Sequence, residues 1–295
     1  MIRRILKGTA KVLLALVALV ALLLVALYFR GSARLQKVYE PAIVDLAVPL
    51  PTDDAALAQG RHWAESHCAS CHGDDLGGQV MIDDPSFAVV HASNLTSGKG
   101  GAASRLDARG WVRAVRHGLD PLGRPLVVMP AEHFRYLSDA DLAAIVGYLE
   151  QMPPIDRETP APQMKPLART LLGAGMLGGI LPAELFDHAE KLPPAPVPGV
   201  TEEYGGYLVT TGGCTTCHGA DLGGGRTPGP DGVPTPNITP AGPVGTWSDA
   251  MFLQMVKTRD SEHMPWKYIR RLTDDELLAI RRYLASVPPV APKAG

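Results

Sequence analysis

The stretches CASCHGDDLGG at residues 68–78 and CTTCHGADLGG at residues 214–224 are two copies of one motif, and together they contain all four cysteines of the chain. In each copy, the second cysteine stands three residues after the first cysteine, and a histidine stands four residues after the first cysteine. On a helix, positions i, i+3 and i+4 lie on one face. One helical turn in each copy therefore presents two thiols and an imidazole to the same side.

The C-x-x-C-H spacing is the attachment signature of c-type haem, in which both thiols add to porphyrin vinyl groups and the imidazole binds the iron. We therefore predict two covalently bound haem c groups. The attaching cysteines are Cys68 and Cys71 for the first and Cys214 and Cys217 for the second, and the axial histidines are His72 and His218. The alternative is a structural zinc site, but a histidine directly after the second cysteine is not the usual zinc-ligand spacing.

Length and composition agree with two small domains. At about 150 residues per domain, 295 residues predict two. Twenty-eight basic and 30 acidic residues give a net charge of −2, without a charge block outside the N-terminus, so we expect no nucleic-acid partner. The content of glycine (31) and proline (27) is high and aromatic residues make up only 6%. Such loop-rich domains fit cores that are completed by a cofactor.

The N-terminus combines a basic start with an uninterrupted run of 18 apolar residues from Val12 to Phe29. This pattern predicts one membrane-spanning helix. A cleaved secretory signal is the rival interpretation, because Gly31-Ser32-Ala33 offers small residues for cleavage. The apolar region of a signal is usually about 7 to 15 residues long, and Arg30 would precede the cleavage site. We therefore predict a retained anchor, residues 1–30.

Haem attachment sets the orientation of this anchor. Because c-type haem is attached outside the bacterial cytoplasm, the N-terminus should lie inside and the rest of the chain outside. We expect a single-pass protein of the bacterial inner membrane with its haem domains on the periplasmic side. Residues 31–54 contain three prolines and no sustained hydrophobic periodicity. This predicts a tether between the membrane and the first domain.

Residues 55–154 and 199–290 form an internal duplication. The paired landmarks are Gly60 and Gly206, Asn94-Leu95-Thr96 and Asn237-Ile238-Thr239, Trp111 and Trp247, Met129-Pro130 and Met264-Pro265, Leu137-Ser138-Asp139 and Leu272-Thr273-Asp274, and Pro153-Pro154 and Pro288-Pro289. The tryptophans are predicted to donate to a haem propionate or to pack in the core. The Asn-x-Thr tripeptides match the glycosylation pattern, but their duplication favours a turn near the haem edge.

A capped helix closes each repeat. Ser138 with Asp141, and Thr273 with Glu276, have the spacing of capping boxes, and the proline pairs end both helices. The glycines at 60 and 206 lie before the haem motifs, where a missing side chain would let the closing helix cross closely against Tyr148 or Tyr283. An ordinary loop glycine is the alternative.

Met129 and Met264 are the predicted sixth iron ligands, because they form the one methionine pair that superimposes in the repeats and each precedes a proline. A methionine thioether raises the haem potential relative to a second histidine. The remaining methionines that we considered are Met81, Met152, Met251 and Met255, the last two as core residues of a helix. The competing histidines are His117, His133 and His263, which have no histidine at the matching position of the other repeat.

Residues 155–198 link the domains and include an apolar segment, residues 167–185, with four glycines. Its glycines, Arg169 and Pro182 argue against a second transmembrane helix. The segment is expected either to pack between the domains or to lie on the membrane or on a partner subunit. The sequence does not choose between these alternatives.

Further motifs carry a family resemblance. They are Pro236-Asn237-Ile238-Thr239-Pro240, Gly245-Thr246-Trp247-Ser248-Asp249, His263-Met264-Pro265-Trp266, Leu272-Thr273-Asp274-Asp275-Glu276-Leu277, and Tyr283-Leu284 to Pro288-Pro289. In these motifs, and more loosely in the first repeat, the chain resembles the cytochrome c subunit of bacterial membrane-bound dehydrogenases for alcohols, gluconate and related substrates. The well-known subunits carry three haem motifs and this chain has two, so the partner is left open.

The resemblance implies a mainly α fold of two tandem class I cytochrome c domains, here after a single N-terminal transmembrane helix, with His/Met haems. It also implies an electron carrier, not an enzyme, which passes electrons from a periplasmic dehydrogenase subunit to a downstream acceptor of the respiratory chain. A dihaem peroxidase is one alternative, but it needs an open site at one iron, and both repeats present the same Met-Pro pair. A haem subunit of a terminal oxidase is another.

Overall fold

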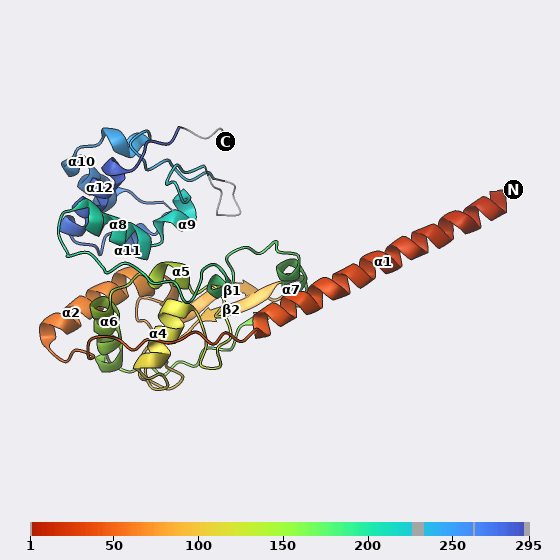
Figure 1. The fold of residues 1–295 in the computed structure, drawn as a ribbon, viewed down its shortest axis with the longest axis horizontal. Helices are drawn as coiled ribbons and strands as arrows, with labels where there is room; N and C mark the ends of the chain where they lie inside the picture. Colours follow the sequence, from red (N-terminus) through yellow and green to blue (C-terminus); the bar gives the residue numbers. More distant parts are fainter. Residues whose placement is uncertain (1, 226–232, 262, 292–295) are drawn as a thin grey trace.

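The computed structural model describes residues 2–225, 233–261 and 263–291. It is mainly helical, as predicted, with two globular domains and a long helix α1 (Ile2–Gln36) that extends away from them (Figure 1). Among the described residues, α1 is the one helix long and apolar enough to cross a membrane, with a mean hydropathy of 3.1. It continues past the predicted boundary at residue 30, because its last turns pack against the linker between the domains.

The first domain is built around the first haem motif. Its helices are α2 (Asp54–Trp63), the π-helical turn η1 (Ala64–Cys68), α3 (Ala69–His72), α4 (Ala108–His117), α5 (Ala131–Phe134) and the closing helix α6 (Asp139–Gln151). The linker that follows contains α7 (Pro166–Gly173) and the 3-10 turn η2 (Pro182–Glu184). The first haem motif, which begins at the end of η1 and continues through α3, therefore follows closely on α2.

The second domain repeats this order. Its helices are α8 (Glu202–Thr211), α9 (Cys214–His218), the 3-10 turn η3 (Pro243–Thr246), α10 (Asp249–Thr258), α11 (Trp266–Ile269) and the closing helix α12 (Asp274–Ser286). In Figure 1 this domain lies above the first, and α1 projects from the side of the first domain. The duplication seen in the sequence is thus a duplication of helix order.

In the first domain, α2 crosses α6 at a glycine. A Cβ atom added to Gly60 would lie 1.9 Å from the carbonyl oxygen of Ala144 and 3.0 Å from Cβ of Tyr148. No side chain fits at that distance, so glycine is what lets the two backbones meet. The predicted crossing at this glycine is confirmed.

The second domain has the same crossing, one residue away from where the sequence placed it. A Cβ atom on Gly205 would lie 2.0 Å from the carbonyl oxygen of Ala279 and 2.8 Å from Cβ of Tyr283. The counterpart of Gly60 is therefore Gly205, and the pairing with Gly206 was wrong. The reason is an extra residue between this glycine and the first cysteine of the second motif, where the chain turns through Gly212 and Gly213 instead of a π-helical turn.

The closing helices are capped differently. In α12, Thr273 and Glu276 form the predicted capping box in full. In α6, the Ser138 hydroxyl accepts from the Asp141 N–H at 2.9 Å, but the Ser138 N–H donates across the domain interface to the Tyr207 hydroxyl at 3.1 Å. Aspartate is one methylene shorter than glutamate, so the first box is completed by the other domain, and the predicted reciprocal bond is wrong there.

The first domain also contains a small antiparallel sheet that the sequence analysis missed. Strands β1 (Gln79–Asp84) and β2 (Ala88–Ala92) form a hairpin, and β3 (Gln163–Met164) from the linker pairs with β2. The strands are two to six residues long. Runs this short are hard to tell from loops by periodicity. The sheet ties the linker back to the first domain.

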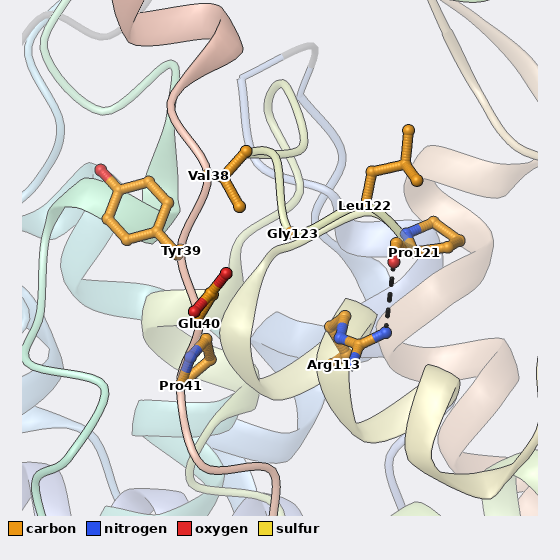
Figure 2. A pocket seen from close by; sticks show the side chains of 8 residues that line it. All are labelled: Val38, Tyr39, Glu40, Pro41, Arg113, Pro121, Leu122 and Gly123. Atoms are coloured by element: carbon orange, nitrogen blue, oxygen red, sulfur yellow. Dashed lines mark hydrogen bonds between the residues drawn. The ribbon is translucent and has the colours of Figure 1, made fainter.

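Residues 37–53 are not the loose tether that was predicted. The Tyr39 N–H donates to the Gly123 carbonyl at 2.8 Å, and the Ala47 N–H donates to Asp139 at 2.7 Å. Three apolar side chains of the segment pack against the first core, namely Ile43, Leu46 and Leu50. The segment is therefore a strap across the first domain. It borders an open cavity of about 250 Å³, and Figure 2 shows the lining residues, which include Leu122 and Gly123.

The apolar linker segment packs against α1 rather than between the domains. A Cβ atom on Gly31 would lie 1.9 Å from the Arg169 carbonyl oxygen, and one on Gly173 would lie 1.9 Å from the Leu27 carbonyl oxygen. Two facing glycines allow this backbone contact, as small residues do between membrane helices. An ion pair between Arg34 and the Glu184 carboxylate holds the same region together.

The glycine crossing in the first domain can be tested by Gly60→Ala. The added methyl group must displace the α6 backbone, and overpacking of this kind costs about 1–3 kcal/mol. We expect a lower urea midpoint by far-UV circular dichroism. Gly178→Ala is the matched control, because a Cβ atom there meets nothing within 4 Å. Equal midpoints for both variants would contradict the crossing.

Candidate haem sites

The structure places each set of predicted attachment residues in one short helical segment. Cys68 ends η1, and Cys71 and His72 follow in α3, whereas Cys214, Cys217 and His218 all lie in α9. All four cysteines are free and partly buried. Burial, aided by the neighbouring thiol, raises the pKa of Cys68 to about 12. The two thiols of each motif therefore lie within one helical turn and do not form a disulfide, as covalent attachment of a ligand requires.

Each motif histidine is oriented by a hydrogen bond to a backbone carbonyl. His72 Nδ1 lies 2.7 Å from the Ser93 oxygen, and His218 Nδ1 lies 2.9 Å from the Pro236 oxygen. Such a bond fixes the tautomer and leaves Nε2 to bind a metal. Burial lowers the pKa of both imidazoles. Both rings are therefore neutral near pH 7, as an iron ligand must be.

The backbone after each motif is the same in both domains. Leu76 and Leu222 both have φ of 57°, which is rare for leucine, and Gly73 and Gly219 have φ of 85° and 84°. The turn is closed by a bond from the Gly78 N–H to the His72 carbonyl at 2.7 Å, and the second domain repeats it. Two copies that keep the same strained turn present their histidines in the same way.

The Asn-x-Thr tripeptides are buried turns that hold the chain after the closing helix. The Asn94 amide donates to the Ile155 carbonyl at 2.6 Å, and the Thr96 hydroxyl accepts from the Ile155 N–H at 2.9 Å. Asn237 and Val290 make the equivalent bond at 2.7 Å. Asn94 is fully buried. This agrees with the predicted turn and leaves no room for a glycan at Asn94.

Both predicted methionine ligands lie on the same kind of turn. Pro130 and Pro265 have φ of −79° and −76° and ψ of 60° and 58°, and each begins a four-residue helix. Met129 packs against the first core cluster together with Cys68. Met264 is half-buried, and the neighbouring Trp266 packs against the second core cluster with Cys214. Met129 thus lies beside the core that contacts Cys68, and Met264 lies two residues before a tryptophan on the core that contacts Cys214.

Two buried indole groups in the first domain have no partner in the protein. Trp63 Nε1 and Trp111 Nε1 are both inaccessible to solvent and lack a hydrogen bond. A buried donor without a partner is costly, so these N–H groups fit the propionates of a bound haem. With the paired thiols and oriented imidazole, the residues of the first site fit covalent haem c.

The predicted pairing of Trp111 with Trp247 is wrong. Trp111 lies four residues after the N-cap Asp107 of α4, and Phe252 lies four residues after the N-cap Ser248 of α10. Phe252 is therefore the counterpart of Trp111, and Trp247 precedes the cap. The two domains share helix positions here but not the aromatic donor.

The competing residues have other roles in the structure. His117 Nδ1 lies 3.0 Å from His188 Nδ1. The pKa of His117 is lowered to about 4, mainly by burial and secondly by the neighbouring His188. His133 Nε2 lies 2.6 Å from the Thr216 hydroxyl. Met251, expected in the core, is 44% exposed. The part of the chain that the structure describes holds no cluster of three His, Cys, Asp or Glu that could bind a metal ion.

The two domains exchange equivalent contacts, which sequence reasoning did not foresee. His62 and Tyr207 each lie two residues after the crossing glycine of their own domain. His62 Nε2 lies 3.0 Å from both carboxylate oxygens of Glu276, and the Tyr207 hydroxyl donates to Asp141 at 2.5 Å. Each carboxylate stands at the third position of the other domain's closing helix. The interface therefore has pseudo-two-fold symmetry, like that of an isologous dimer.

The same symmetry brings the methionine side of each domain to the haem motif of the other. His133, in α5 after Met129, bonds to Thr216 between the two cysteines of the second motif. Lys267, in α11 after Met264, pairs with Asp74 just after the first motif's histidine. The two candidate sites are thus held against each other by residues next to their predicted ligands.

The first domain is similar to a known protein family. Residues 55–149 match the protein family described as cytochrome c oxidase, cbb3-type, subunit III. The chain is 28% identical over 285 residues to the cytochrome c subunit of the quinone-type alcohol dehydrogenase of Gluconacetobacter polyoxogenes, covering 83% of this chain and 59% of that protein. It is 26% identical over 285 residues to the fructose dehydrogenase cytochrome subunit of Gluconobacter japonicus, covering 82% and 55%.

A third relative is a nicotinate dehydrogenase subunit of Pseudomonas putida, 30% identical over 226 residues. The match covers 70% of this chain and 18% of that protein. The chain therefore spans less than two thirds of each of these relatives. The similarity therefore concerns only part of each relative.

The exchanged contacts predict a pH dependence. Burial alone would raise the pKa of Glu276, but hydrogen bonds from His62 and Thr273 hold it below its usual value of 4.5. The carboxylate therefore stabilises the fold above about pH 4.5, and this contribution disappears as the pH falls through the lower, folded pKa. Glu276→Gln should cost about 1–3 kcal/mol at pH 7 and progressively less below pH 4.5.

This prediction is checked with urea midpoints of the haem-loaded protein between pH 3 and pH 7. Asp275→Asn is the control, because Asp275 is an exposed carboxylate in the same helical turn. If the difference between wild type and Glu276→Gln does not change with pH, the buried bond to His62 does not contribute as described.

Proposed function

Because the chain belongs to the cytochrome c family, we propose that it is a membrane-anchored dihaem c-type cytochrome that carries electrons from a dehydrogenase to the respiratory chain, on the periplasmic side of the bacterial inner membrane. The observation that carries the proposal is the duplicated site. In both copies, two thiols lie in one turn with a histidine whose Nδ1 is held by a carbonyl. When bound, haem c supplies an iron that accepts and donates single electrons.

We assign His72 with Met129, and His218 with Met264, as the axial ligands of the two irons. Each histidine is neutral because burial lowers its pKa. Its Nδ1 bonds to a backbone carbonyl, so its Nε2 is free to bind the iron. Each methionine precedes a proline whose backbone angles agree between the domains. Two six-coordinate sites favour a carrier over a dihaem peroxidase, which needs one open iron.

The packing of α1 supports a retained anchor. Cleavage after Ala33 would remove Leu27 and Gly31, which contact the backbone of α7. It would also separate Ser32 from Arg169, whose guanidinium lies 3.2 Å from the serine hydroxyl. A signal peptide has no need of such partners in the mature domain, so these contacts favour a helix that stays attached.

The partner is proposed from the relatives. Two of them are named as cytochrome subunits of dehydrogenases, for alcohol and for fructose. A dehydrogenase that releases electrons outside the cytoplasm needs a carrier of this kind. A haem subunit of a terminal oxidase is the second candidate, because the family that matches residues 55–149 is described by such a subunit.

The ligand assignment is tested by Met264→Ala. We expect one of the two haems to become high-spin, to bind carbon monoxide when reduced and to have a lower potential, while both stay covalently attached. Met251→Ala is the control, because Met251 is exposed on α10. A fully low-spin spectrum with an unchanged methionine-to-iron charge-transfer band would show that another residue is the ligand.

The carrier function is tested by purifying the native protein in mild detergent. We expect a dehydrogenase subunit to remain bound and its substrate to reduce both haems, measured by their absorption at the reduced α band. Recovery of oxidase subunits instead would favour the second candidate. Peroxide turnover by the isolated cytochrome would contradict both carrier assignments.

A further inference from the structure

The linker helix α7 is held at the level where α1 reaches the end of its apolar run. Gly173 meets Leu27, and Gly31 meets Arg169, at backbone distances that leave no room for a side chain. Leu27 lies within the apolar run of residues 12–29, and Gly31 lies two residues beyond it. Whatever surrounds this part of α1 also surrounds α7.

The residues at this level are those that mark a membrane interface. Tyr28 and Phe29 end the apolar run and contact each other edge to face, and Arg30 follows. The guanidinium of Arg169 lies 5.9 Å from the centre of the Tyr28 ring. Aromatic rings and basic side chains of this kind gather at the boundary between hydrocarbon and head groups. The start of α7 therefore lies at that boundary if α1 spans the membrane.

The outer surface of α7 and the turn after it is apolar. Leu167 is 54% exposed and Met176 is 71% exposed. The sequence has no charged residue between Arg169 and Glu184. This surface continues from α1, whose apolar window is not buried at all by the protein. Exposure to water is unfavourable for both surfaces, and a lipid environment would cover both.

The turn after α7 can enter a region poor in water because its backbone donors are paired. The N–H groups of Ala174, Gly175 and Met176 donate to carbonyl oxygens of the helix, each at 3.0 Å. An unpaired N–H group would cost several kcal/mol in lipid. Leu177 and Ile180 fold back onto the cluster around the sheet, so the apolar tip is residues 174–176.

We propose that residues 167–176 form a second membrane contact, lying in the lipid interface of the outer leaflet beside α1. The inference rests on the proposed membrane anchor and deepens it. The occupant of this surface is the bilayer itself, because the surface is continuous with the helix that spans it. Since Ala168 and Leu35 pack in the cluster that contains β2, the two contacts would hold the first domain at a fixed angle to the membrane.

Spin labels test this on the full-length, haem-loaded protein in nanodiscs of phosphatidylethanolamine and phosphatidylglycerol. Three variants each carry one nitroxide, at Met176→Cys, at Leu22→Cys in α1 and at Val197→Cys in the linker, where Val197 is 83% exposed. Collision with oxygen, enriched in lipid, is compared with collision with a water-soluble nickel chelate by power saturation.

We expect positions 22 and 176 to favour oxygen and position 197 to favour the nickel chelate, with position 176 shallower than position 22. If position 22 favours oxygen and position 176 behaves like position 197, the anchor stands and the second contact is overturned, which leaves the apolar surface to a protein partner. If position 22 also behaves like position 197, the anchor itself is wrong. Unchanged haem spectra in all three variants show that the comparison is made on folded protein.

Discussion

The fold of each domain depends on one constraint. Two thiols and an imidazole must project from one helical turn on the same side, and a backbone carbonyl must hold Nδ1 of the imidazole. The carbonyl oxygens that hold it belong to Ser93 and Pro236. Each is followed by the asparagine that bonds the chain beyond the closing helix. The haem motif, the Asn-x-Thr turn and the end of the closing helix are thus linked through neighbouring residues. The glycine crossing then brings the closing helix back against the helix before the motif.

The domain interface reuses this framework. The carboxylate at the third position of each closing helix bonds to a side chain from the other domain, His62 or Tyr207. In α12 the glutamate also completes its own cap, whereas in α6 the aspartate is too short and Tyr207 receives the Ser138 N–H. Helix capping and domain pairing therefore share the same residues. A substitution at these positions would loosen both together.

The sequence was sufficient where the fold follows from residues close in the chain, as in the attachment motifs and the closing helices. The glycines were misaligned because the second repeat has one extra residue before its motif, and the tryptophans because the loops before α4 and α10 differ in length. The strap at residues 37–53 looked like a tether because prolines break its period, yet distant segments hold it. The bonds of His62 and Tyr207 could not be foreseen, since each repeat looked complete by itself. Met129 and Met264 stay predictions, because their assignment as ligands rests on the repeat.

The sheet of the first domain explains why the anchor joins this domain and not the other. Strand β2 pairs with β3 of the linker, and the cluster around it includes Ala88, Ala168 of α7 and Leu35 of α1. The end of α1 and the start of the linker thus pack together, so that a force on the anchor acts on the first domain directly. The second domain is held to the first through the exchanged bonds. A relay built this way keeps the spacing of its two haem motifs independent of the membrane attachment.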